Sequence, residues 1–463
     1  MKLPPRLLAL SISAAFAAVP LSAFGQSADA EKMKVLEQKL ERSMQLIEQL
    51  SAKVSQLEQT KTSPAAAPAS GEQQAKLEAL ERQVAQLGSG ISNRSSDSGL
   101  PLHGFADVGL SRSGENNAVR GKGSKGFNVG TLDLYLTPQF GDRVRSLVEL
   151  VFEVDKDGNV ATDLERVQMG YAFSDAATGW IGRFHTPYGY WNTAFHHGAQ
   201  IQTSVSRPRF LDFEDKGGIL PAHTTGAWLT GSVGASSGRF GYDLYVGNAP
   251  RLQVDGDANP SALSTLNAAA LNPHAAAGGY AGTGTLNMRM AGSSSYQPST
   301  GGNVWYEPSS IDGLRLGLHA LRANIEDDSA DRNETRVGML GAYGVYATDR
   351  WELLGEYYAF RNKDRSADTG THSSWAAYVQ AGYNIGRMTP YARLEKTSLD
   401  QKDNYFAVQE SGRSYTRGAL GLRYDLDPKA AIKFEYLRTN QDDIGPGLRD
   451  NYHEARMQYA IRF

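Results

Sequence analysis

Two different hydrophobic periods divide this chain of 463 residues. Between Met33 and Leu57 the apolar residues recur at alternating spacings of three and four, whereas from Leu102 onward apolar and polar residues alternate one by one. The first period is typical of a coiled-coil helix and the second of β-strands with two different faces. The sequence therefore predicts an N-terminal α-helical coiled coil followed by a large β-domain.

The predicted coiled coil has one narrow apolar seam, with Ser43 at its single polar position: Met33, Leu36, Leu40, Ile47, Leu50, Val54 and Leu57. A lone helix with so narrow a stripe would bury too little surface to be stable in water, so partner helices are expected. A monomeric helix that lies on another surface is the alternative. The mixed seam residues do not decide between a dimer and a trimer.

The remaining N-terminal segments have distinct compositions. Residues 1–25 are typical of a secretory signal peptide, because Lys2 and Arg6 precede a short apolar stretch and small residues surround Phe24. The alternative is a membrane anchor, although the apolar stretch is shorter than the roughly 20 residues that span a bilayer. We assign residues 26–60 to the coiled coil, 61–99 to a linker with a second short coiled-coil helix, and 100–463 to the β-domain.

Alternation in the β-domain is clearest in the final strand. Ala455, Met457, Tyr459, Ile461 and Phe463 share one face, and Glu454, Arg456, Gln458 and Arg462 share the other. Charges also stand in the middle of earlier strands, as at Lys433 and Glu435. A water-filled lumen tolerates such charges, whereas a dry core would penalise them. The pattern predicts a transmembrane antiparallel β-barrel.

Counting the alternating runs predicts about sixteen strands, at residues 102–112, 127–137, 143–153, 162–173, 180–186, 223–233, 239–248, 302–308, 314–324, 334–347, 350–361, 373–384, 388–397, 416–427, 430–440 and 451–463. Short links alternate with long ones, which include 113–126, 187–222, 249–301 and 398–415. Short periplasmic turns and long external loops alternate in this way in outer-membrane barrels. An even count places both ends of the barrel on the periplasmic side, where the predicted stalk must lie.

The C-terminal residues carry a candidate assembly signal. Outer-membrane barrels end on an aromatic residue that the barrel assembly machinery recognises, so we expect Tyr459, Ile461 and Phe463 to act as this signal. The expected location is the outer membrane, in contact with its lipid and lipopolysaccharide, with the stalk in the periplasm.

The link 187–222 is unusually dense in aromatic residues and in charges of both signs. Such a segment needs a surface to pack on, and we expect it to fold into the barrel and narrow the pore. The alternative is that it caps the external rim or clamps a neighbouring subunit. Its candidate pore-lining residues are His196, His197, Arg207, Arg209, Asp212, Glu214, Asp215 and Lys216.

Strand alternation also places basic side chains on the inner wall near this link: Arg145, Arg166, Arg183 and His185. A basic cluster would concentrate anions at a constriction. Asp133, Glu149 and Glu153 on the same walls would neutralise part of it, so cation preference and weak selectivity stay open. Tyr188, Tyr190 and Trp191 could alternatively form a track for sugar rings, although aromatic residues near a membrane interface are more often girdle residues.

A short motif links the chain to a known family. Gly182 to Gly189 reads GRFHTPYG, which resembles the G-[RQ]-x-x-T-P-[FY]-G stretch of phosphate-selective porins where the fifth strand enters the third loop. From about Leu102 to Phe463 the chain resembles a sixteen-stranded trimeric Gram-negative porin. The stalk is similar to the periplasmic coiled coils of phosphate-selective porins and of trimeric porins proposed to take up dicarboxylates. The resemblance implies a homotrimer, one pore per subunit and a constricting third loop. Lys216 is the single lysine of the link, whereas phosphate porins carry a lysine-rich ladder.

Other chemistries lack support in the sequence. The chain has no cysteine, which removes thiolate catalysis. The stretch Gly234–Gly238 matches G-x-S-x-G but lies at a predicted turn, whereas a nucleophile elbow needs a strand leading into a helix. We expect no cofactor, no metal, no nucleic acid and no enzymatic activity. The leading hypothesis is a porin for passive diffusion of small hydrophilic solutes, with anions favoured; the alternative is a structural anchor that tethers the envelope through its coiled coil.

Overall fold

The computed structural model describes residues 102–114, 116–117, 121–122, 125–140, 142–154, 160–195, 198–214, 218–253, 285–288, 297–327, 333–366, 370–407, 409, 411–442 and 451–463. The chain divides into two units, Met1–Ser96 and Asp97–Phe463, and the described residues all belong to the second. The predicted signal peptide, linker and coiled-coil seam therefore lie outside the described residues, as do His196, His197, Asp215 and Lys216.

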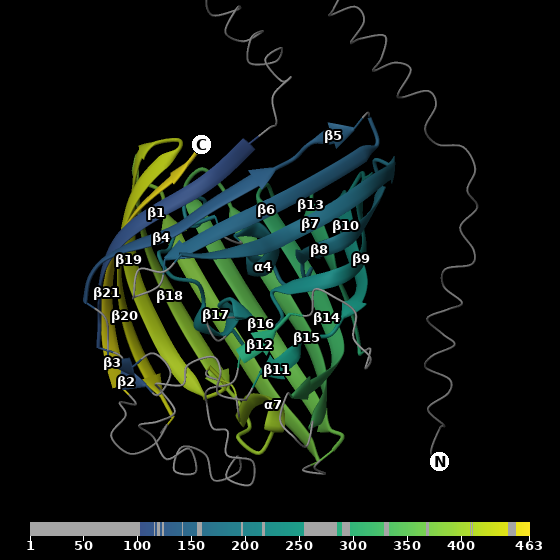
Figure 1. Ribbon diagram of the computed structural model, residues 1–463. Coiled ribbons are helices and arrows are strands. Elements are labelled where there is room, and N and C mark those ends of the chain that lie inside the picture. The colour runs from purple at the N-terminus through teal and green to yellow at the C-terminus, as the bar shows by residue number, and fades with distance from the viewer. Residues whose placement is uncertain are drawn as a thin grey trace, which may run out of the picture. The chain divides into compact units, whose positions relative to one another are not determined.

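Within the described ranges, 16 long strands form a closed antiparallel barrel (Figure 1). They are β1 (Leu102–Ser113), β4 (Lys125–Leu136), β6 (Val144–Val154), β7 (Val160–Ser174), β8 (Ala177–His185), β9 (His223–Ala235), β10 (Gly238–Asn248), β13 (Pro298–Pro308), β14 (Leu314–Asp327), β15 (Glu334–Ala347), β16 (Trp351–Asp364), β17 (Thr371–Tyr383), β18 (Met388–Ser398), β19 (Tyr415–Asp427), β20 (Ala430–Gln441) and β21 (Asn451–Arg462). Shorter strands are β2 (Asn116–Asn117), β3 (Gly121–Lys122), β5 (Gln139–Phe140), β11 (Arg251–Gln253) and β12 (Thr285–Asn287).

The barrel closes between its first and last long strands. β1 pairs with β21 in a register that sets Ala106 opposite Ile461. Phe463 continues this pairing, because its N–H donates to the Gly104 carbonyl at 3.0 Å and its own carbonyl accepts from the Gly104 N–H at 3.2 Å. The ring of strands therefore has no free edge at this seam.

The predicted strands match the observed ones one for one, with differences at their ends. The largest is at β13, which begins at Pro298 rather than at residue 302. Residues 298–301 read PSTG and carry no apolar alternation, so the sequence had no signal for this extension. The short strands β11 and β12 lie within the predicted link 249–301 and were not predicted.

The two faces of the wall differ in the way that alternation predicts. Outward residues include Leu340, Leu394 and Leu420, which are 64–65% exposed. Their inward neighbours Arg393 and Ala419 are buried. Exposed aliphatic side chains in a continuous band are expected of a lipid-facing surface. In the described part of the chain, no helix is long and apolar enough to span a membrane.

Short and long connections lie at opposite ends of the barrel. The short-turn end carries tight links such as 175–176, 236–237 and 428–429, together with Phe463. The long-loop end carries the link 186–222, which contains α4 (Trp191–Ala194) and the 3-10 helix η1 (Arg209–Leu211), and the link 399–414, which contains α7 (Asn404–Ala407). Figure 1 shows α4 inside the ring of strands.

Candidate functional site: the inner loop and the lumen wall

Residues 186–222, here called the inner loop, run through the interior of the barrel. The loop leaves β8 at the long-loop end and reaches the opposite end, where Gln200 Nε2 donates to the Pro428 carbonyl in a short turn at 3.3 Å. Arg423 Nη1 on β19 donates to the Gln200 carbonyl at 2.6 Å nearby. The loop therefore crosses much of the length of the lumen before it returns to β9.

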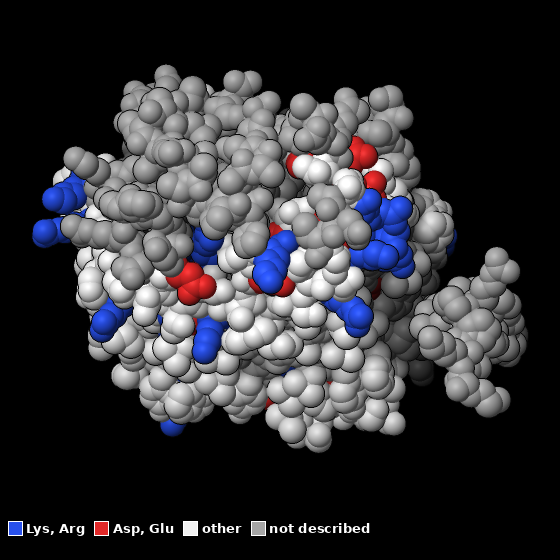
Figure 2. Space-filling model, turned by 90° about the horizontal axis from the view of Figure 1, so that it is seen from below, with Lys and Arg blue, Asp and Glu red and all other residues white. Residues whose placement is uncertain are grey.

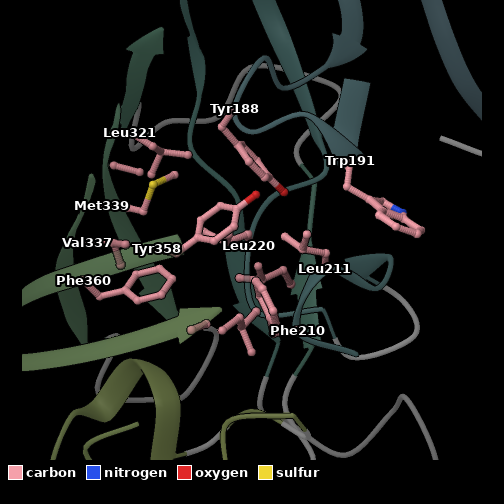
Figure 3. Close-up of a cluster of buried hydrophobic side chains, with 14 of the residues drawn as sticks. Tyr188, Trp191, Phe210, Leu211, Leu220, Leu321, Val337, Met339, Tyr358 and Phe360 are labelled. Atoms are coloured by element: carbon pink, nitrogen blue, oxygen red, sulfur yellow. The ribbon is translucent and has the colours of Figure 1, made fainter. Parts of the chain in front are cut away.

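One side of the inner loop forms an apolar core with the barrel wall. Figure 3 shows Tyr188, Phe210, Leu211 and Leu220 of the loop near side chains from three neighbouring strands, Leu321, Val337, Met339, Tyr358 and Phe360. The Trp191 ring points away from this group and packs edge-to-face on Tyr378 of β17, with ring centres 5.6 Å apart. Trp191 and Phe210 are 0% exposed. Burial of these rings accounts for the aromatic density of the link. Tyr188 and Trp191 are therefore not available to stack on a sugar in the pore, and only Tyr190 of that set is partly exposed.

Carboxylates of the wall accept hydrogen bonds from the loop backbone. Glu356 on β16 accepts from the Tyr190 N–H at 3.0 Å and from the Trp191 N–H at 2.7 Å. The hydroxyl groups of Tyr358 and Tyr378 donate to the same carboxylate at 2.6 and 2.7 Å. Glu435 accepts in the same way from the Ser206 N–H at 3.0 Å and Glu395 from the Arg209 N–H at 2.8 Å, whereas Glu352 accepts from the side-chain hydroxyl of Thr203 at 2.6 Å.

Basic side chains of the wall bind the loop carbonyls. Arg393 on β18 donates to the Ser206 carbonyl at 2.8 Å, to Ser206 Oγ at 2.6 Å and to the Arg207 carbonyl at 3.1 Å. Lys433 on β20 donates to the Ser204 carbonyl at 3.1 Å. Both basic side chains are 0% exposed. The wall thus supplies both charge signs to peptide groups that lack partners in regular secondary structure.

These contacts correct one part of the sequence interpretation. Mid-strand charges such as Lys433 and Glu435 were expected to face water, but they are buried against the inner loop. The loop backbone has taken the place of water as their hydrogen-bonding partner. Strand alternation finds which residues point inward, but it cannot tell whether they meet solvent or protein.

The loop returns to the wall through a histidine held by two carboxylates. His223, the first residue of β9, lies with Nε2 2.7 Å from Glu165 Oε2 and Nδ1 3.2 Å from Glu214 Oε2. The His223 N–H also donates to Glu214 Oε1 at 2.7 Å. Burial by itself would raise the pKa of the Glu214 carboxyl, but His223 outweighs burial and lowers it below its usual range. His223 was absent from the predicted site residues, because as the first residue of a strand it carries no motif.

The predicted basic wall is largely paired with carboxylates. Arg183 Nε donates to the Glu165 carbonyl at 2.8 Å, and its Nη2 lies 3.5 Å from Glu165 Oε2. His185 Nε2 lies 3.8 Å from Glu149 Oε2, and Arg166 also pairs with Glu149. These residues are brought together around two glutamates. Arg145 is apart from them, exposed near the short-turn end of β6.

The described members of the predicted loop set are mainly buried. Arg207 donates from Nε to the Leu211 carbonyl at 2.9 Å, and its guanidinium lies 4.1 Å from the Phe213 ring centre. Arg209 donates from Nη1 to Gln441 Oε1 at 2.7 Å. Asp212 is half-buried. Arg207 and Arg209 therefore serve the packing of the loop rather than an open constriction.

Arg456 on the final strand is partly exposed, as the sequence predicts for the arginines of the inner loop. Arg456 Nη2 lies 2.6 Å from Glu454 Oε1, and Arg417 Nη2 lies 2.5 Å from Glu454 Oε2. The Arg456 side chain is 29% exposed, whereas that of Glu454 is 4% exposed. Alternation had already placed Arg456 on the inward face, but its neighbour Arg417 could not be foreseen from spacing.

A second link also packs inward. The short helix α7 buries Tyr405 and Phe406, and the Tyr405 hydroxyl donates to the Ile219 carbonyl of the inner loop at 2.6 Å. Phe406 packs edge-to-face on Phe360 at 5.2 Å. The predicted external loop 398–415 thus lies partly on the inner loop. Burial raises the pKa of Asp403, just before α7, from 3.8 to about 6.

Charges of both signs appear at the long-loop end. In the view from that end, Lys and Arg side chains lie beside Asp and Glu in several places (Figure 2). Within the described ranges, no group of three or more His, Asp or Glu residues could hold a metal ion. The match to G-x-S-x-G at Gly234–Gly238 spans the hairpin between β9 and β10 and precedes no helix.

The fold defines a closed, sixteen-stranded antiparallel barrel in which the link 186–222 folds inward. Residues 261–463 match the family model described as outer membrane protein beta-barrel domain. No curated protein matches the sequence.

Solved structures of low sequence identity are similar to this chain. The outer membrane channel DcaP of Acinetobacter baumannii has a TM-score of 0.50 and 10% identity, covering 79% of this chain and 98% of that one. An anion-selective porin from Comamonas acidovorans has a TM-score of 0.49 and 12% identity, covering 79% and 99%. OmpF of Salmonella typhi, in complex with daunomycin, has a TM-score of 0.47 and 14% identity, covering 79% and 97%. The likeness to DcaP concerns the fold alone.

Proposed function

We propose that this chain is an outer-membrane porin through which small hydrophilic solutes diffuse passively. The observation that carries the proposal is the closed barrel with aliphatic side chains outside and charged side chains inside. Lipid outside and water inside explain this division, whereas a soluble barrel would expose polar groups outward. The match of residues 261–463 to an outer membrane protein beta-barrel domain also supports the proposal of an outer-membrane barrel.

We place the passage between the inner loop and the wall opposite its apolar core. A polar cavity of about 220 Å³ lies there, lined by Val205 of the loop and by wall residues that include Asp107, Asn128, Arg456 and Gln458. The apolar core and the charged anchors hold the loop away from this wall. The loop thereby sets the width of the opening without closing it.

We propose that this passage favours anions. In the pair Arg166–Glu149 the side chains are 22% and 2% exposed, and in Arg456–Glu454 they are 29% and 4% exposed. In both pairs the guanidinium is the accessible partner and the carboxylate is buried. A solute in the lumen therefore meets the positive member first, which raises the local concentration of anions.

Reversal potentials in planar bilayers under a potassium chloride gradient test this proposal. Combining Arg166→Gln with Arg456→Gln should lower the anion-to-cation permeability ratio at least about twofold. Arg143→Gln, which removes one positive charge from an exposed turn outside the lumen, is the control and should leave the ratio unchanged. Absence of conductance steps would refute the channel, and an unchanged ratio in the double variant would refute only the selectivity.

We further propose that the protein is a homotrimer whose N-terminal helices associate in the periplasm. The support is the apolar seam from Met33 to Leu57, which a single helix cannot bury. The mass of the detergent-purified protein, measured with and without residues 26–99, tests this. A monomeric full-length chain would contradict it.

A further inference from the structure

A cavity at the short-turn end of the lumen has the size and the lining of a small-molecule site. It measures about 400 Å³ and is lined by Tyr190 of the inner loop, by Glu307 and Arg315 of the wall, and by the apolar residues Ile311 and Val345. This volume falls within the range of roughly 300–1,000 Å³ that is typical of small-molecule sites. It lies apart from the polar cavity beside Arg456.

Three charged side chains line this cavity: Arg315 and Glu307, which form an oriented ion pair, and Asp312. Arg315 donates to Glu307 Oε1 from Nε at 2.8 Å and from Nη2 at 2.5 Å. Both contacts use the same carboxylate oxygen, so Arg315 Nη1 and Glu307 Oε2 remain for a ligand. Each side chain is 33% exposed. The ion pair thus offers a donor and an acceptor side by side with no net charge of its own, and Asp312 adds one negative charge to the lining.

Aromatic rings hold this pair in place. The Arg315 guanidinium lies 4.4 Å from the ring centre of Trp305 and 5.9 Å from that of Tyr190. Trp305 itself lies flat on the wall, because a Cβ atom at Gly241 would come within 2.0 Å of the ring. Gly241 therefore leaves room for the Trp305 ring to pack against the wall and contact the Arg315 guanidinium, while Tyr190 lines the cavity.

The same wall continues away from the cavity with similar chemistry. Trp228 donates from Nε1 to Asp243 Oδ1 at 3.1 Å, and Asn303 Nδ2 donates to Asp243 Oδ2 at 3.2 Å. Trp180 lies beside Trp228 with ring centres 6.1 Å apart and planes tilted by 21°. Half-buried aromatic rings thus alternate with hydrogen-bonding groups along β8, β9, β10 and β13.

We propose that the cavity at Tyr190, Glu307 and Arg315 binds a neutral pyranose ring. Tyr190 and the apolar side chains match the C–H faces of such a ring, and the Arg315–Glu307 pair matches adjacent hydroxyl groups. An anion would have to compete with Glu307 for Arg315. A zwitterionic amino acid would have to separate the pair, whereas a sugar binds it intact. The inference rests on the proposed function only in that the ring reaches the site through the lumen.

Calorimetric titration of the detergent-purified full chain with methyl α-glucoside tests the site. Saturable binding is expected, with sorbitol much weaker because it has similar hydroxyl groups but no rigid ring. Glu307→Gln should weaken glucoside binding about tenfold and strengthen binding of benzoate, since Arg315 then loses its paired carboxylate. Asp349→Asn, at an exposed position in another short turn, should change neither.

Trp305 is argued to be a positioning residue, and its variants separate this role from folding. Trp305→Leu should weaken glucoside binding, whereas Trp305→Phe should retain it, because the phenyl ring still supports Arg315. Trp351→Phe is the matched control on the outer face, where Trp351 is 45% exposed. Heat-modifiable migration in gels confirms that each barrel has folded.

Three results would overturn the proposal: no saturable binding of methyl α-glucoside, binding unaffected by Glu307→Gln, or tighter binding of benzoate or phenylalanine than of the glucoside to the unaltered protein. Conductance recorded on the same preparation distinguishes failure of the sugar site from failure of the porin function. A conducting channel without glucoside binding refutes the site alone.

Discussion

Glu356 and Trp191 are joined by a hydrogen bond of 2.7 Å from the Trp191 N–H to Glu356 Oε1, although 165 residues separate them in the chain. The carboxylate is 3% exposed and accepts three further hydrogen bonds. This single side chain anchors the start of α4 to the barrel wall and brings two tyrosine hydroxyl groups to the same point.

Replacing Glu356 by Gln should loosen the inner loop without preventing formation of the barrel. The amide has one acceptor instead of two and directs N–H groups toward existing donors, so buried polar groups lose their partners. We expect a loss of about 2–4 kcal/mol in the free energy of unfolding. Urea titration followed by gel mobility measures the loss, and single-channel records should become noisier. Asp349→Asn is the control, and equal stability of both variants would contradict the anchoring role.

Arg393→Met tests the opposite set of anchors. The substitution keeps an unbranched side chain but removes the Arg393 donor from the carbonyls of Ser206 and Arg207 and from Glu395 Oε1. Destabilisation of about 3–5 kcal/mol is expected, because a buried carboxylate loses its counter-charge. Combining Arg393→Met with Glu395→Leu should recover part of the loss in a double-mutant cycle. Arg322→Met, at an exposed position, should be close to neutral, and strict additivity of the cycle would count against the pairing.

The contact between α7 and the inner loop should depend on pH through Asp403. Its pKa is about 6 in the folded protein and 3.8 otherwise, so the folded loop binds more protons between these values. The packing of α7 is therefore most stable below pH 3.8, weakens as the pH rises toward 6 and is weakest above it. Conductance should rise over the same range in single-channel recordings, and Asp403→Asn should flatten the profile. A profile that is unchanged in this variant would assign the effect to another group.

The base of the inner loop should respond to acid in the opposite direction. The pKa of Glu214 is lowered below its usual value of 4.5, so its ion pair with His223 contributes fully above pH 4.5 and is lost as the pH falls through the folded-state pKa. Protease cleavage within residues 186–222 should accelerate below that pH. Glu214→Gln should show fast cleavage already at neutral pH; resistance of this variant at pH 7 would argue that the pair does not hold the loop.

The sequence predicted the features of this structure that depend on neighbouring residues, and it missed those that depend on contacts between residues far apart in the chain. Alternation is local, so it located all sixteen long strands and put Arg456 on the inward face. It could not show that Arg393 and Lys433 meet peptide groups instead of water, because this depends on a loop some two hundred residues away in the chain. The same limit explains why the sequence predicts an external loop at 398–415, where α7 packs inward.

The candidate site shows this limit most clearly. Basic residues near the motif at Gly182 were predicted to act together, yet Arg183 and His185 are buried beside carboxylates whose position follows from register across β6, β7 and β8. The exposed guanidinium groups of Arg166 and Arg456 belong to strands at distant places in the sequence. Which partner of an ion pair is exposed depends on three-dimensional packing, so the spacing of residues along the sequence cannot predict it.

The pairing of β1 with β21 sets a condition on how the barrel can be made. Asp107 and Ala460 lie opposite each other in the closed wall but at opposite ends of the β-domain. Until the last strand has been delivered, the first therefore keeps a row of bare peptide groups on one side, which would pair with any other strand it met. The unpaired edge of β1 must be protected during assembly until β21, more than three hundred residues later in the chain, has been exported. A delay in export would therefore promote aggregation through β1 and β21.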